Sequence, residues 1–119
     1  MDNNIENLTK RIIDLRDARD WKQFHNPKDL SLSLVLEAGE VMEHFQWKNT
    51  EEMAKYVQTN RAEIGEELAD VLFWVLLMSH DLEIDILDAL DKKIIKNEQK
   101  YPVEKSKGNA KKYTELEKF

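Results

Sequence analysis

Residues 32–47, LSLVLEAGEVMEHFQW, and residues 61–76, RAEIGEELADVLFWVL, decide the fold of this chain. Both segments are strongly apolar, but each carries a pair of acidic residues three positions apart. The pairs are Glu37 with Glu40 and Glu67 with Asp70. Because residues at that spacing lie on the same side of a helix, the pattern predicts two helices that each hold two carboxylates against an apolar core.

The two segments also align with each other at an offset of 30 residues. On a helical wheel, at about 100° per residue, the apolar positions of each segment form one stripe, and its acids lie at the same angles from that stripe. Two such helices, packed antiparallel about a local two-fold axis, bring all four carboxylates together. Glu63 and Glu66 form a further acidic pair. Glu66 falls on the far side of the wheel and is not expected to bind a metal, whereas Glu63 lies nearer and can support the site.

Four acids held against a core repel one another unless a cation or a shared proton compensates their charge. Ligands that are all oxygen atoms suit Mg²⁺ or Mn²⁺. The plain alternative is that each acidic pair is a solvated helix face or a partner for lysine. The equal offsets of the two pairs from matching apolar stripes favour the metal site.

The composition of the 119 residues limits the classes of protein to consider. The length fits one domain. A formal charge of -6 argues against a general binder of nucleic acid, although a nucleotide bridged by a metal can still bind. The absence of cysteine excludes disulfides and thiolate metal sites. The first residues lack the apolar core of a signal peptide, and the apolar run 71–78 is too short to span a bilayer, so we expect a soluble cytoplasmic protein without a membrane partner.

Three glycines, two prolines and 35% charged residues favour an all-α fold. Apolar residues at helical spacing predict helices over residues 5–19, 28–45, 51–58, 60–80 and 84–100, with Thr50 as the cap of the short third helix. We expect residues 1–102 to form one domain and residues 103–119 an irregular tail. The run 71–78 is apolar nearly all round its helix, which a monomer of this size has difficulty burying, and this predicts an oligomer.

Four separated motifs, in order, resemble one known family. They are FHNPKDLSLSLVLEAGEVMEHFQWK at 24–48, EELADVLFWVLLMSHDLEIDI at 66–86, KNEQKYP at 96–102 and SKGNAKKYTEL at 106–116. The chain resembles the MazG-like all-α nucleoside triphosphate pyrophosphohydrolases from about residue 20 to residue 116, with the greatest likeness to the dCTP pyrophosphatase branch. The resemblance implies a four-helix-bundle-type fold, assembled as a dimer or tetramer with sites shared between subunits.

The resemblance also implies an activity. Such enzymes hydrolyse the bond between the α- and β-phosphates of a nucleotide, here a deoxynucleotide such as dCTP or a modified dCTP, and release the monophosphate and pyrophosphate. Carried over by motif, Mg²⁺ is held by Glu37, Glu40, Glu67 and Asp70. Glu37 or Glu40 is also the candidate to take the proton from the attacking water. Two alternatives stay open: a sister activity on dUTP or phosphoribosyl-ATP, and a non-enzymatic helical interaction module.

The remaining site residues follow from the same motifs. His25 and Trp47 are expected beside the base, where an indole suits a flat ring. Contacts to the triphosphate are expected from Lys93, Asn97, Lys100 and Tyr101. Family members often have arginine where this chain has Lys100, and lysine lacks the bidentate fork of arginine. Trp74 lies within the apolar run, and we expect it in the core or in a subunit interface.

Overall fold

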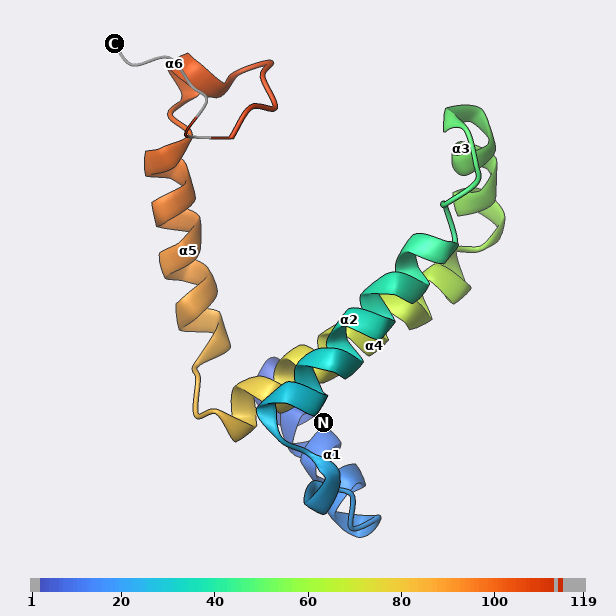
Figure 1. The fold of residues 1–119 in the computed structure, drawn as a ribbon, viewed down its shortest axis with the longest axis vertical. Helices are drawn as coiled ribbons and strands as arrows, with labels where there is room; N and C mark the ends of the chain where they lie inside the picture. The colour runs from blue at the N-terminus through green and yellow to red at the C-terminus, as the bar shows by residue number, and fades with distance from the viewer. Residues whose placement is uncertain (1–2, 113, 115–119) are drawn as a thin grey trace. The chain divides into compact units, whose positions relative to one another are not determined.

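The computed structural model describes residues 3–112 and 114, and over these residues the chain is all-α, as predicted. The helices are α1 Ile5–Ala18, the 3-10 helix η1 Lys22–Phe24, α2 Pro27–Glu43, α3 Thr50–Thr59, α4 Arg61–Asp81, α5 Ile86–Lys100 and α6 Val103–Ser106 (Figure 1). Each of the five predicted helices is present, with its ends within two residues of the expected positions. Contacts divide the chain into two compact units, Met1–Ile84 and Asp85–Phe119.

In the first unit, α2 and α4 lie side by side and run in opposite directions, joined through α3 (Figure 1). This is the largest helix–helix contact among the described residues, and α1 packs against α4. Among the described residues, the buried apolar side chains are Leu30, Leu76 and Leu77. The antiparallel pair therefore provides the arrangement that the 30-residue offset predicts.

Asparagine side chains cap the N-terminal ends of α2 and α3. The Asn26 side chain accepts a hydrogen bond from the backbone N–H of Asp29, at 2.9 Å, and Pro27 occupies the first helical position, which suits a residue without a backbone N–H. At α3 the cap is Asn49, which forms a capping box with Glu52. The prediction of Thr50 as this cap was wrong by one residue, because asparagine is at least as good an acceptor at this position and lies next to it.

The C-terminal ends of α1 and α4 share one geometry. Asp20 and Glu83 adopt left-handed φ angles of 52° and 56°, just beyond each helix. The N–H of Trp21 then donates to the carbonyl of Arg16 at 3.1 Å, and the N–H of Ile84 donates to that of Ser79 at 2.8 Å. These are Schellman motifs, which satisfy carbonyls that the helix leaves open. The first motif places Trp21 beside Arg16.

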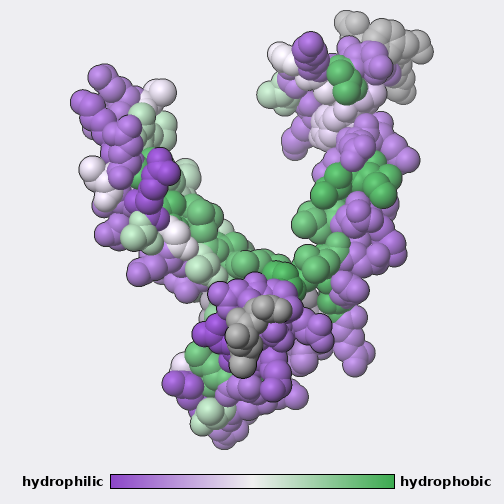
Figure 2. Space-filling model, turned by 180° about the vertical axis from the view of Figure 1, so that it is seen from behind, coloured by the Kyte–Doolittle hydropathy of each residue, from purple (hydrophilic) through white to green (hydrophobic). Residues whose placement is uncertain are grey.

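The second unit contains α5 and α6. The side chain of Asp85 caps α5 by accepting from the N–H of Asp88, so the helix begins two residues later than predicted. Apolar side chains reach the surface along α5, among them Leu87, Leu90 and Ile94 (Figure 2). The predicted boundary at residue 102 falls inside this unit and remains a prediction.

The predicted tail, residues 103–119, begins with the single turn of α6. Residues 107–112 form no further helix. Tyr113 and residues 115–119, on which part of the tail motif falls, lie outside the described residues. Every helix that the structure describes is too short or too polar to cross a lipid bilayer.

Candidate metal centre and adjoining pocket

The four acidic residues of the two patterned segments meet between α2 and α4. Each of them offers one carboxylate oxygen, and these four atoms lie within 4.8 Å of one another. The residues of this acidic quartet are Glu37, Glu40, Glu67 and Asp70. Two oxygens bound to the same Mg²⁺ are at most about 4.2 Å apart. Small side-chain rotations are therefore enough to bring the quartet around a cation of that size.

Two buried carboxylate oxygens of the quartet lack a hydrogen-bond donor within the described part of the chain. Oε2 of Glu37 and Oε2 of Glu67 are buried without a hydrogen-bond partner. A buried carboxylate oxygen without a donor is unfavourable, since it loses its hydration and gains nothing in return. These orphaned oxygens and the all-oxygen chemistry of the quartet fit a hard divalent cation.

The electrostatics of the quartet agree with that fit. Burial raises the pKa of Glu37, followed by the close approach and charge of Glu40 and then the charges of Asp70 and Glu67. The pKa of Glu67 is raised first by the close approach of Glu40, then by burial and neighbouring negative charges. A carboxylate whose folded-state pKa is raised stabilises the fold less as the pH rises through that pKa. The quartet therefore destabilises the metal-free fold at neutral pH, and a bound cation relieves this repulsion.

Divalent cations should stabilise the fold through the quartet. At about 100 times its dissociation constant, Mg²⁺ adds about 2.7 kcal/mol to the free energy of unfolding, which raises Tm by about 10 °C. The increase should shrink as the pH is lowered, because protons compete with the cation for the same oxygens. Thermal unfolding with MgCl₂, with NaCl at equal ionic strength and with EDTA measures the effect. Equal Tm values in the three solutions would contradict a metal site here.

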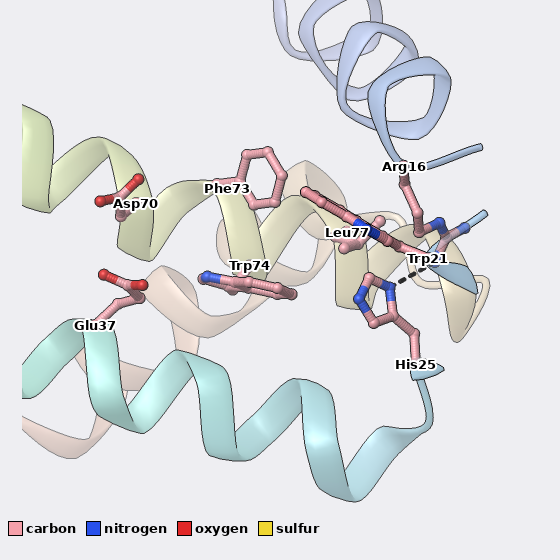
Figure 3. Close-up of a pocket in the computed structure, with 8 residues that line it drawn as sticks. All are labelled: Arg16, Trp21, His25, Glu37, Asp70, Phe73, Trp74 and Leu77. Carbon is pink, nitrogen blue, oxygen red and sulfur yellow. Dashed lines mark hydrogen bonds between the residues drawn. The ribbon is translucent and has the colours of Figure 1, made fainter. Parts of the chain in front are cut away.

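An aromatic pocket adjoins the quartet within the first unit. Its volume is about 180 Å³. The lining residues are Arg16, Trp21, His25, Glu37, Asp70, Phe73, Trp74 and Leu77 (Figure 3). Glu37 and Asp70 thus belong both to the quartet and to the pocket wall. The rings of His25 and Trp74 meet edge-on, with centroids 5.7 Å apart at an interplanar angle of 75°.

Of the two residues expected beside the base, the structure places only His25 in this pocket. Trp47 lies in the turn after α2, is 87% exposed and does not line the pocket. Trp74, which we expect in the core or in a subunit interface, is half-buried and lines the pocket. A signal for it was present in the sequence, because Trp74 follows Asp70 by four positions and so shares its face of α4.

The four residues expected at the triphosphate lie in the second unit. Lys93, Asn97 and Lys100 are on α5, at spacings that share a helix face, and Tyr101 is its C-terminal cap residue. Their contact with a triphosphate remains a prediction.

Arg16 and Asp81 were not predicted as site residues from the sequence, because a charged residue on the polar face of an amphipathic helix carries no local sign that it will be buried.

Comparison with known proteins identifies the family of this chain. Residues 32–116 match the MazG-like family. dCTP pyrophosphatase 1 of Mus musculus is 39% identical over 114 residues, which cover 94% of this chain and 67% of the mouse protein. The human dCTP pyrophosphatase 1 is 35% identical over the same shares of the two chains. The crystal structure of a pyrophosphatase from Archaeoglobus fulgidus DSM 4304 superposes with a TM-score of 0.80 at 35% identity, covering 86% of this chain and 95% of that one.

The chain therefore belongs to the MazG-like family. It is an enzyme of the nucleoside triphosphate pyrophosphohydrolase class. This membership sets aside the alternative of a non-enzymatic helical interaction module.

Proposed function

We propose that the chain hydrolyses the α–β phosphate bond of a deoxynucleoside triphosphate, with dCTP or a modified dCTP as the first candidate, and releases the monophosphate and pyrophosphate. The observation that carries this proposal is the junction of the acidic quartet with the aromatic pocket at Glu37 and Asp70. A base in the pocket leaves its phosphates beside the quartet. The names of the mouse and human relatives support the choice of dCTP.

The size of the pocket suits one ring system rather than a whole nucleotide. Its volume of about 180 Å³ is below the roughly 300 Å³ at which pockets for drug-sized ligands begin. Trp21, Phe73 and Trp74 offer ring surfaces against which a flat base can pack. We therefore expect a pyrimidine to fit better than a purine.

The quartet would hold Mg²⁺, with Mn²⁺ as a possible substitute. When bound, such a cation neutralises the phosphate charge and activates water. The protein contributes the carboxylates that fix this position and a candidate base for the proton of the attacking water. That base is Glu37 or Glu40.

Pyrophosphate release from a panel of NTPs and dNTPs, with Mg²⁺ and with EDTA, tests the proposal. We expect metal-dependent release with dCTP or a modified dCTP ranked first. The panel includes dUTP and phosphoribosyl-ATP, because sister enzymes keep the metal site and change the base pocket. A higher kcat/KM for one of these would replace dCTP as the substrate. If the folded protein released pyrophosphate from none of these nucleotides, the result would contradict the proposed activity.

Trp74 and Trp47 give a matched test of the base pocket. We expect Trp74→Leu to raise KM for the best nucleotide by about 10-fold, because stacking of a base on an aromatic ring contributes about 1–3 kcal/mol. Trp47→Leu changes the same residue type at an exposed position and should have a smaller effect. Measuring KM for both variants shows which of the two tryptophans contacts the base. A larger effect from Trp47 would instead place the base against that residue.

We propose that the enzyme acts as a homo-oligomer, a dimer or a tetramer. Large apolar side chains on α2 and α4 are exposed in the single chain, including Leu32, Val35, Leu36, Met42 and Leu68 (Figure 2). Such surface is usually covered by another chain or another part of the same chain. Sedimentation equilibrium at several concentrations measures the mass, and a monomer at micromolar concentration would contradict the proposal.

A further inference from the structure

An ion pair with a buried guanidinium adjoins the pocket, and its arginine lines the pocket wall. Arg16, at the end of α1, is only 2% exposed and donates to both carboxylate oxygens of Asp81, at the end of α4. The distances are 2.6 Å from Nη1 to Oδ2 and 2.9 Å from Nη2 to Oδ1. Nε of Arg16 is buried and has no hydrogen-bond partner among the described residues. Burying a pair of charges is weak support for stability, so a pair kept in a pocket wall calls for another role.

The same guanidinium also reaches a ring in the pocket. Nη1 of Arg16 lies 3.5 Å from Nδ1 of His25 (Figure 3). A guanidinium has only donors, so a hydrogen bond at this contact requires Nδ1 to be an acceptor without a proton. A neutral imidazole with a bare Nδ1 carries its hydrogen on Nε2. In Figure 3 this second nitrogen faces away from Arg16, on the side of the pocket where Trp74 lies.

The charged surroundings of His25 favour the neutral ring. Burial lowers the pKa of His25, and the positive charge of Arg16 lowers it further, against a smaller opposite effect of Asp81. Glu37 and Asp70 line the same pocket. Asp81 thus has two effects: it holds the guanidinium in place, and it partly offsets the charge that the guanidinium brings.

We propose that Arg16 and Asp81 are positioning residues that hold His25 as its Nε2–H tautomer, so that the pocket offers one fixed hydrogen-bond donor to a heterocyclic base. The base must then present an acceptor at that edge, a carbonyl oxygen or an unprotonated ring nitrogen. This inference rests on the proposed function, because it takes the pocket as the site of the base. The Nε2–H donor would let the pocket select the base by hydrogen bonding as well as by size and stacking.

The tautomer is measured on the full-length chain without nucleotide. Long-range ¹H–¹⁵N spectra of the protein with labelled histidine report which ring nitrogen is protonated, and His25→Gln identifies the signals of His25 among the three histidines. We expect Nε2–H alone in the wild type at neutral pH. In the double variant Arg16→Met/Asp81→Leu, which removes both charges together, we expect a detectable share of Nδ1–H. A proton on Nδ1 in the wild type, or an unchanged tautomer in the double variant, would overturn the proposal.

A kinetic cycle tests whether the pair acts through His25. We expect Arg16→Met/Asp81→Leu to raise KM for dCTP about 10-fold with little change in kcat, and to raise it no further in a chain that already carries His25→Ala. A purely structural role predicts the same increase in both backgrounds and would overturn the positioning role. If the wild type hydrolyses no nucleotide, the proposed function fails, while the spectra still decide whether Arg16 and Asp81 fix the tautomer.

Discussion

We expect the Glu67→Gln variant to release pyrophosphate at least about 100-fold more slowly than the wild type, because the quartet loses a charged ligand. Glutamine has nearly the same shape as glutamate, but its amide replaces an anionic oxygen and brings donors to a place built from acceptors. The variants Glu40→Ala and Asp70→Ala should likewise abolish turnover while the chain stays folded. Initial rates at saturating Mg²⁺ and nucleotide measure the effect.

The same substitution should raise the stability of the metal-free protein. The pKa of Glu67 is raised in the fold, so its stabilising contribution is present at low pH and is lost as the pH rises through that folded-state pKa. At neutral pH the neutral glutamine removes this repulsion. Thermal unfolding in EDTA should therefore give a higher Tm for Glu67→Gln than for the wild type. Lower activity together with higher stability is the pattern of a functional site, and a misfolded variant cannot produce it.

Glu66→Gln is the matched control, because it makes the same chemical change on the same helix at an exposed position outside the quartet. Its rate should stay within about twofold of the wild type, as for most surface substitutions. If Glu67→Gln kept full activity, the assignment of the metal site would be wrong. Equal losses in the two variants would show only a general effect of charge on α4.

Asp81→Asn is expected to be the most destabilising of the substitutions considered. It leaves Arg16 buried with a full positive charge and only the exposed Asp17 as an anionic neighbour, which lowers the free energy of unfolding by about 3–5 kcal/mol. Against a total stability of roughly 5–15 kcal/mol, this is a large share. Tm should fall by at least about 10 °C, as measured by circular dichroism.

Two controls separate the buried ion pair from its surroundings. Asp17 lies 3.8 Å from Nε of Arg16, but its side chain is 57% exposed, so Asp17→Asn should change stability by less than about 1 kcal/mol. The double variant Arg16→Met/Asp81→Leu replaces both charges with apolar groups and should recover most of the lost stability. A small effect of Asp81→Asn, similar to that of Asp17→Asn, would show that water reaches the pair.

The ion pair between Arg16 and Asp81 also makes the stability of the fold depend on pH in the acid range. Burial works to raise the pKa of Asp81, but the hydrogen bonds and charge of Arg16 outweigh it, with smaller help from His80 and Lys22, and the net pKa is lowered. Since the folded pKa lies below the unfolded one, this stabilisation is complete above the ordinary aspartate pKa. It is lost as the pH falls from there through the folded-state pKa.

The acidic quartet could be predicted from the sequence because the information that specifies it is local. Pairs of acids three residues apart, beside repeated apolar stripes, fix which side of each helix carries them. The antiparallel packing of α2 and α4 then follows from the short connection through α3. Helix ends were predicted less well, since they depend on single side chains such as Asn49.

The pocket depended on contacts that the sequence does not mark. Arg16 and Asp81 are 65 residues apart, and each is an ordinary charged residue in its own helix. Trp74 stood inside a run of apolar residues, where its role in lining the pocket could not be separated from burial. Trp47 was expected at the base from likeness alone, and in this chain it lies exposed beyond the end of α2.

Glu37 and Asp70 belong both to the acidic quartet and to the wall of the aromatic pocket, and under the proposed function this restricts how the enzyme can evolve. A substitution that reshapes the pocket for a larger base also shifts carboxylates that belong to the quartet. A substitution that changes the substrate preference is therefore expected to change the catalytic rate as well, so selection acts on both properties together. Divergence within such a family should begin at pocket residues outside the quartet, such as Trp21 and Phe73, where a ring can change size while the acids stay in place.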